Sequence, residues 1–247
     1  MTWNTTMGLL SSIALFAPIA VMVWLRLTAY KTFPALLAYY ILIFSYNIFT
    51  EDYVHIDAQL VYYLGLINNL LDAPLMMTFL LYFSPSIKFT HRLKLLIIAF
   101  LIFEAIILTV FGLNVNSITI ILGPGLILTT ALCVIVFIRQ TKIAIVNQKA
   151  LGRSMIAAAL CFAYGCYGLI YVLFYLSNSP NVEDTFLVYY WASFISATLL
   201  SGGVIVEYRR ILKLHELKRT RQELSSVYSE DRNPMIIRKV KLDFEVE

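Results

Sequence analysis

Charged residues are scarce in this sequence. Only 14% of its 247 residues are Asp, Glu, Lys or Arg, whereas 60% are hydrophobic, and the mean hydropathy is +0.78. Soluble domains carry about 25% charged residues. The charges also leave long gaps, because segments 8–25, 32–50, 154–182 and 185–206 have none and segment 95–138 has only Glu104. This composition excludes a soluble globular domain.

The gaps have the length that a membrane helix requires. About 20 apolar residues, at about 1.5 Å each, cross roughly 30 Å of hydrocarbon. Segment 95–138 is too long for one such helix, and Asn114–Ser117 is expected to divide it. We therefore predict an all-α integral membrane protein with seven transmembrane helices, at about 8–28, 32–50, 60–83, 93–113, 117–138, 154–177 and 185–208.

Lys and Arg are absent from every second predicted loop. With seven spans, all 19 lie on the same side of the membrane. The loops on the opposite side carry acidic residues and no Lys or Arg: Glu51, Asp52, Asp57, Glu183 and Asp184. Positive residues stay on the cytoplasmic side, so we expect the N-terminus outside and the C-terminus in the cytoplasm. We expect this multi-pass protein in the plasma membrane. The net charge of +4 then reflects orientation and does not indicate nucleic-acid binding.

Motifs of common enzyme classes are also missing. The sequence has no GxSxG, HExxH or P-loop pattern. Its three His residues are predicted in an outer loop, at a membrane edge and in the tail, so they cannot form a metal cluster within the membrane. We therefore expect no metal site and no enzyme, and the sequence names no cofactor. The three Cys residues lie in predicted spans, where we interpret them as packing residues: Cys133, Cys161 and Cys166.

Two carboxyl groups, those of Asp72 and Glu104, lie inside predicted spans that contain no Lys, Arg or His. Such residues cost several kcal/mol in hydrocarbon, roughly 3 or more. Since burial disfavours the charged form, we expect neutral carboxyls hydrogen-bonded to Asn or Tyr. On a helix, Asn68 and Asn69 lie on faces adjoining that of Asp72, which produces a local polar cluster.

Two interpretations of the polar residues stay open. They either join helices through hydrogen bonds of under about 2 kcal/mol each, or they line a pocket for a ligand or a proton. The pocket is expected to open toward the outer half of the membrane. Gly123-Pro124-Gly125 is expected to interrupt the fifth span. The candidate pocket residues are Asn47, Asn68, Asn69, Asp72, Glu104, Tyr164, Tyr167, Tyr171 and Trp191.

The segment after the seventh span is rich in basic residues. We divide the chain into a transmembrane domain, 1–208, and a cytoplasmic segment, 209–247, in which the last helix continues and a strand-like stretch, 239–246, follows. The basic helix either lies on the anionic inner leaflet or forms a stalk that binds a partner protein or a second copy. Its candidate contact residues are Arg209, Arg210, Leu214, Leu217 and Lys218.

Seven spans with this orientation, and Asp72-Ala73-Pro74-Leu75 in the third, make residues 8–208 resemble the microbial rhodopsins. The resemblance implies a seven-helix bundle around a central ligand. The family's Arg, its Asp-Trp pair and its Thr-rich spacing before the Pro are absent here. The predicted seventh helix also lacks the Lys that holds retinal, and no other span has one, so covalent retinal is excluded. A relative of this kind is expected to bind a pigment or lipid without a covalent bond, or to signal through its tail.

The leading hypothesis is therefore a receptor or sensor module that binds a small hydrophobic or amphipathic ligand and signals through its cytoplasmic tail to a partner protein. A small proton-coupled transporter is the first alternative, because a carboxyl near the membrane midplane suits it. A non-catalytic assembly subunit, in which Asp72 only joins helices, is the second.

Overall fold

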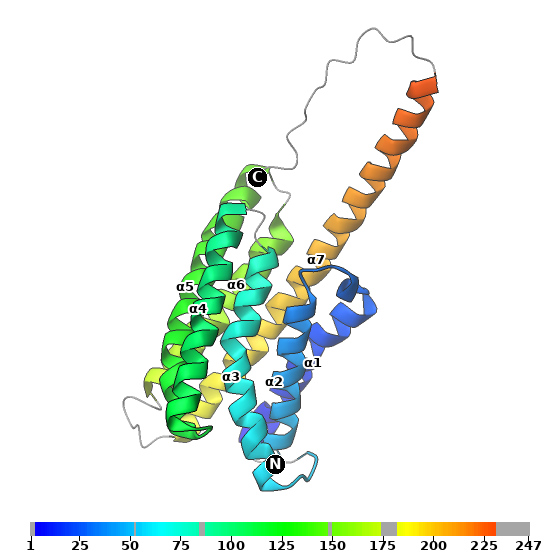
Figure 1. Ribbon diagram of the computed structural model, residues 1–247. Coiled ribbons are helices and arrows are strands. Elements are labelled where there is room, and N and C mark those ends of the chain that lie inside the picture. Colours follow the sequence, from blue (N-terminus) through cyan, green and yellow to red (C-terminus); the bar gives the residue numbers. More distant parts are fainter. Residues whose placement is uncertain (1–2, 52, 84–86, 148–149, 174–181, 231–247) are drawn as a thin grey trace.

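The computed structural model describes residues 3–51, 53–83, 87–147, 150–173 and 182–230, and all regular elements in these ranges are helices (Figure 1). The predicted all-α fold is thereby confirmed. The predicted strand-like stretch, 239–246, lies outside the described residues. The elements are α1 (Trp3–Trp24), η1 (Leu27–Ala29), α2 (Pro34–Thr50), α3 (Ala58–Phe83), α4 (Ile87–Phe111), α5 (Val115–Asn147), α6 (Leu151–Tyr171) and α7 (Val182–Glu230).

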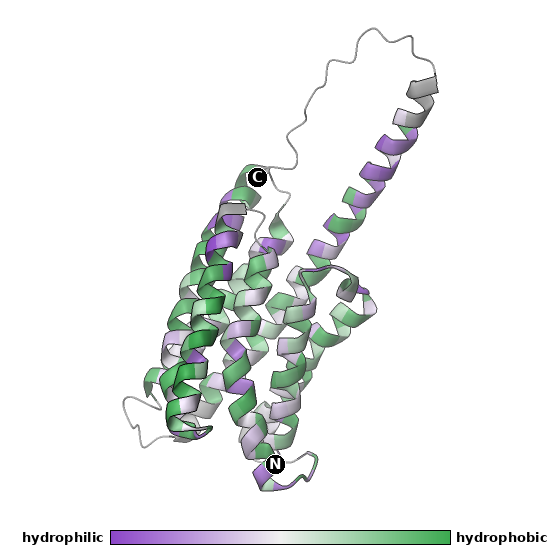
Figure 2. Ribbon diagram, in the orientation of Figure 1, coloured by the Kyte–Doolittle hydropathy of each residue, from purple (hydrophilic) through white to green (hydrophobic). Residues whose placement is uncertain are grey.

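Six of the helices are long and apolar enough to cross a membrane, as a multi-pass membrane protein requires. The remaining one, α2, is apolar but has only 17 residues, which is about 26 Å of helix. Hydrophobic residues predominate along the helices of the bundle (Figure 2), and many of the large ones are exposed. For example, Ile127 is 71% exposed and Val110 is 67% exposed. An exposed apolar surface of this extent is typical of a protein that contacts a membrane.

Six helices form a closed ring, because neighbouring pairs pack in the order α1–α2–α3–α5–α6–α7 and α7 returns to α1. The fourth helix packs outside this ring, against α3 and α5. It is also the least buried of the long apolar helices, with 17% of its most apolar window inside the protein. The ring therefore closes by direct contact between α3 and α5.

The predicted division of segment 95–138 is confirmed. Helix α4 ends at Phe111, and Gly112 follows with φ +74°, a left-handed conformation that suits glycine. The side chain of Asn114 then accepts a hydrogen bond of 2.9 Å from the backbone N–H of Ser117, which caps the start of α5.

The interruption expected at Gly123-Pro124-Gly125 is wrong, because α5 runs unbroken from Val115 to Asn147. The two glycines instead allow other groups to come close. A Cβ atom on Gly125 would lie 3.1 Å from Ala73 of α3, and one on Gly123 would lie 2.8 Å from the Tyr171 hydroxyl of α6. This part of α5 is thus shaped by helix packing on both sides of the proline.

Helices α6 and α7 approach most closely at two glycines. A Cβ atom on Gly152 would lie 2.5 Å from the backbone nitrogen of Glu207, and one on Gly203 would lie 2.9 Å from the backbone nitrogen of Ile156. Beside the first contact, the buried Glu207 carboxylate accepts hydrogen bonds of 2.9 Å from Arg153 and Arg210. Small residues and one ion-pair cluster therefore fix α7 against α6.

Beyond this contact, α7 leaves the bundle as a continuous helix (Figure 1). Residues 212–225 are exposed, and their polar surface contrasts with the apolar bundle (Figure 2). The helix has 49 residues and no break near residue 208. We call residues 211–230 the stalk.

Replacing Gly152 by Ala is expected to destabilise the protein by about 1–3 kcal/mol, because the added methyl group overlaps the backbone of Glu207. Thermal unfolding of the protein in nanodiscs measures this effect. Gly165→Ala on the same helix is the control, since a Cβ atom there has no neighbour within 4 Å. Equal unfolding temperatures for the two variants would contradict the close packing.

Candidate functional site

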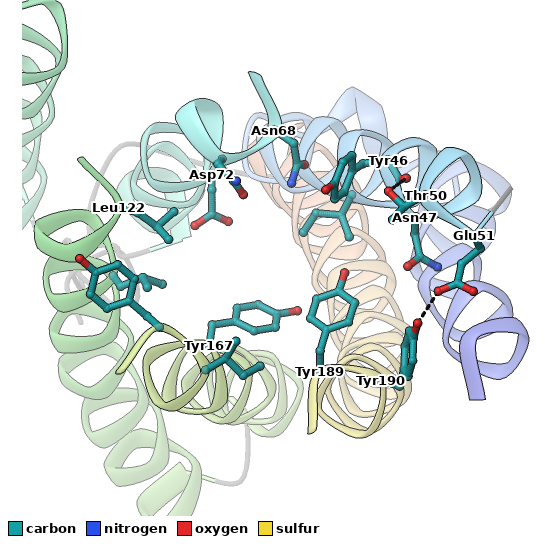
Figure 3. Close-up of a pocket in the computed structure, with 15 residues that line it drawn as sticks. Tyr46, Asn47, Thr50, Glu51, Asn68, Asp72, Leu122, Tyr167, Tyr189 and Tyr190 are labelled. Carbon is teal, nitrogen blue, oxygen red and sulfur yellow. Dashed lines mark hydrogen bonds between the residues drawn. The ribbon is translucent and has the colours of Figure 1, made fainter. Parts of the chain in front are cut away.

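A cavity of about 380 Å³ lies inside the ring of helices. Five helices supply its walls, and Figure 3 shows their side chains pointing into a shared space. Its size is within the range of small-molecule sites, about 300–1,000 Å³. The lining residues are Ile43, Tyr46, Asn47, Thr50, Glu51, Asn68, Asn69, Asp72, Leu122, Leu126, Tyr167, Ile170, Tyr171, Tyr189 and Tyr190.

The cavity occupies only one half of the bundle. Its lining comes from the C-terminal parts of α2 and α6 and from the N-terminal parts of α3, α5 and α7, which meet at one end. Asp72 lies about 21 Å along α3 from Ala58, near the middle of that helix. None of the lining residues lies beyond it on α3. Buried apolar side chains fill the other half there, among them Met76, Phe79 and Leu80.

The Asp72 carboxyl forms the floor of the cavity. Its Oδ1 atom accepts a hydrogen bond of 3.1 Å from the Tyr164 hydroxyl of α6, and the Tyr39 hydroxyl of α2 also interacts with this carboxyl. The Asp72 side chain is half-buried because it faces the cavity (Figure 3). Asn68 and Asn69, about one turn closer to the mouth on α3, line the cavity beside it.

Tyrosine rings form a continuous wall along α6 and α7. Tyr167 makes a T-shaped contact with Tyr164 and stacks on Tyr189, with ring centroids 6.0 Å apart in both pairs. Tyr189 in turn contacts Tyr190 at 5.9 Å. Farther along α6, the Tyr171 hydroxyl donates a hydrogen bond of 3.1 Å to the carbonyl oxygen of Thr119 on α5.

The mouth of the cavity is held by a hydrogen-bonded cluster of α1, α2 and α7. The Tyr190 hydroxyl donates to the carboxylate of Glu51, which follows the last residue of α2 (Figure 3). The same carboxylate lies directly over Gly8, where a Cβ atom would be 2.5 Å from its Oε2 atom. One turn below, Asn47 donates a hydrogen bond of 2.7 Å to the Ser12 hydroxyl of α1.

Most of the predicted pocket residues meet at this cavity. Asn47, Asn68, Asn69, Asp72, Tyr167 and Tyr171 line it, and Tyr164 lies behind Asp72 as its hydrogen-bond donor. Two predicted residues do not line it. Glu104 is buried on α4, outside the ring, and its Oε1 atom has no partner in the described part of the chain. Trp191 is 47% exposed on the outside of α7, where it packs against Phe194.

Sequence reasoning missed several lining residues, namely Tyr46, Thr50, Glu51, Tyr189 and Tyr190. Part of the signal was present, because positions 43, 46, 47 and 50 have the i, i+3, i+4, i+7 spacing of one helix face. Glu51 is predicted in an outer loop, whereas the structure places it directly after α2, where it lines the cavity. No local pattern marks the two tyrosines of α7.

The candidate partner-binding residues lie at the other end of the molecule. Arg209, Leu214, Leu217 and Lys218 are exposed on α7, whereas Arg210 is half-buried and hydrogen-bonded to Glu207. Arg210, Leu214 and Lys218 also line a smaller cavity of about 230 Å³ between α7 and the α1–α2 connection.

The described residues contain no group of three or more His, Cys, Asp or Glu side chains that could hold a metal ion. Comparison of the chain with protein families, curated proteins and solved structures finds no match. The resemblance to microbial rhodopsins therefore stays a prediction.

Tyr190→Phe is expected to lower the free energy of unfolding by about 1–2 kcal/mol, because it removes the hydroxyl that joins α7 to Glu51. Thermal or denaturant unfolding in lipid nanodiscs checks this. Tyr62→Phe, at an exposed ring on α3, serves as the matched control. If both variants unfold alike, the mouth cluster does not stabilise the bundle.

Proposed function

We propose that this protein is a receptor or sensor module of the plasma membrane. It crosses the membrane seven times, binds a small hydrophobic or amphipathic molecule in the central cavity, and passes the resulting displacement of α7 to a partner protein. The observation that carries the proposal is the cavity itself, which has polar groups among apolar side chains and reaches Asp72 near the middle of α3. Polar groups at such a depth are costly and are typical of functional sites.

The cavity occupies only one half of the bundle, which favours a receptor over a carrier. A transporter must expose its site to each side in turn. Here, buried apolar side chains of α3 follow Asp72 immediately, including Ala73, Met76 and Met77. Asp72 faces the cavity, where it can bind a ligand or exchange a proton, and its hydrogen bond with Tyr164 joins α3 to α6. The assembly-subunit alternative rests on the last of these roles alone.

Helix α7 links the cavity to the stalk. Tyr189 and Tyr190 of this helix line the cavity, and the same helix continues to Glu230 without a break. A ligand that contacts these tyrosines favours one packing of α7 on α6 over another. The exposed stalk residues, Leu214, Leu217 and Lys218 among them, then offer a changed surface to a partner protein or a second copy.

Charge supports the proposed orientation. The stalk, the α1–α2 connection, the C-terminal ends of α3 and α5 and the N-terminal ends of α4 and α6 lie at one end of the bundle (Figure 1). The basic residues of the sequence belong to these parts of the chain or to the segments that join them or adjoin the stalk. The cavity mouth, with Glu51, is at the opposite end. By the positive-inside rule, the mouth faces outward and the stalk lies in the cytoplasm. We therefore propose that this protein shares the seven-span topology and orientation of the microbial rhodopsins, without covalent retinal.

Single cysteines test this orientation in intact cells, on a background in which the three native cysteines are replaced by Ala. A membrane-impermeant maleimide is expected to label Asp57→Cys, near the cavity mouth, and to leave Lys142→Cys, near the end of α5, unlabelled until the cells are lysed. Labelling of Lys142→Cys alone would reverse the proposed orientation.

Native mass spectrometry of protein extracted gently from its own membrane tests the ligand. We expect a stoichiometric small-molecule adduct, which Leu122→Trp removes by filling the cavity. Ile127→Trp on the same helix is the control, because Ile127 is 71% exposed on the outside of the bundle. A bound protein with no adduct would favour the assembly subunit. Uptake of a solute into proteoliposomes would favour the transporter.

A further inference from the structure

The central cavity contains acidic groups and no basic ones. Among its fifteen lining residues are two carboxyls, those of Asp72 and Glu51, and no Lys, Arg or His. The lysines and arginines of the described chain belong to the C-terminal parts of α5 and α7, the N-terminal parts of α4 and α6, and the α1–α2 connection, which lie toward the opposite end of the bundle or on the stalk (Figure 1). His55, four residues after Glu51 in the α2–α3 connection, is not among the residues that line the cavity.

The described hydrogen bonds to these carboxyls come from tyrosine hydroxyl groups. Tyr164 donates to Asp72, and Tyr190 donates to Glu51. A hydroxyl satisfies a lone pair but brings no positive charge, so the ionised cavity keeps its negative charge in surroundings of low dielectric constant. A carboxyl in such surroundings either takes up a proton or pairs with an opposite charge. The lining residues offer no such charge, and a cationic ligand can supply it.

The rest of the lining suits an ammonium group with an apolar body. Tyrosine rings attract cations through their π faces, and this attraction strengthens when water is excluded. The side-chain carbonyl oxygens of Asn68 and Asn69 can accept hydrogen bonds from an ammonium N–H beside Asp72. Four apolar side chains can cover a hydrocarbon or aromatic part of a ligand: Ile43, Leu122, Leu126 and Ile170.

We infer that the cavity binds a small organic cation, a protonated amine whose ammonium group lies beside Asp72 and whose apolar part lies against α5 and α6. This inference rests on the proposed function and names its ligand class. An inorganic cation fits less well, since the described residues offer no group of three acidic or other metal-ligating side chains.

Three probes with one carbon skeleton test the charge preference: 4-phenylbutylamine, 4-phenylbutanol and 4-phenylbutyrate. Calorimetric titration of the full chain in zwitterionic nanodiscs at pH 7 gives their affinities, with empty nanodiscs as the blank. The amine is expected to bind at least about 10-fold more tightly than the alcohol, and the carboxylate is expected not to bind.

Asp72→Asn keeps the size of the side chain and removes the charge. It is expected to weaken the amine by about 10–100-fold and to leave the alcohol unchanged, which also reports that the cavity is intact. Asn68→Lys is the second variant, because its ammonium can pair with Asp72 at i+4 and so compete with the amine. Glu104→Gln is the matched control: it removes a buried carboxyl outside the ring and is expected to leave the amine affinity unchanged.

The outcomes separate this inference from the proposed function. Equal binding of the three probes, with loss of all three in Leu122→Trp, would overturn the charge preference and retain the ligand-binding cavity. Binding of the amine that Asp72→Asn does not weaken would overturn the position of the ammonium group. Binding of Na⁺ or Ca²⁺ in place of the amine would overturn the ligand class. If no probe binds and native mass spectrometry shows no adduct, both proposals fail.

Discussion

A carboxyl group in the middle of a membrane helix has to find its partners inside the protein, and Asp72 imposes this condition on the bundle. Its partners come from helices distant in sequence, the Tyr164 hydroxyl of α6 and the Tyr39 hydroxyl of α2. Both helices must therefore face α3 at the same depth. The closed ring satisfies this requirement, and the space that remains around the carboxyl is the cavity.

The helices could be predicted because each depends on local properties. Apolar runs give their number, and Asn114 marks one boundary by its capping side chain. At Pro124 the same approach failed, because the packing of Ala73 and Tyr171 against the flanking glycines is a tertiary effect. The membrane-type helical fold was therefore within reach of the sequence, whereas the continuity of α5 was not.

The candidate site divides in a similar way. Asn68, Asn69 and Asp72 are neighbours on one helix, so their spacing brings them together in any fold that keeps α3. Glu51 and Tyr190 meet only because α2 and α7 both border α1 in the ring. Glu104 was placed with Asp72 because both are carboxyls in spans. Its helix packs outside the ring, and no pattern in the sequence encodes the order of helices around the bundle.

Because α7 is one continuous helix, a tilt near the cavity is carried along its whole length. The helix packs closely against α6 at Gly203 and Glu207, and from Gly203 it continues to Glu230, about 40 Å farther along the axis. A tilt of α7 by about 5° around Gly203 moves its far end by about 3.5 Å. A small change of helix packing near the cavity therefore produces a larger displacement of the stalk. The close approach of α6 and α7 at this point requires residues without side chains, and Gly152 and Gly203 are such residues.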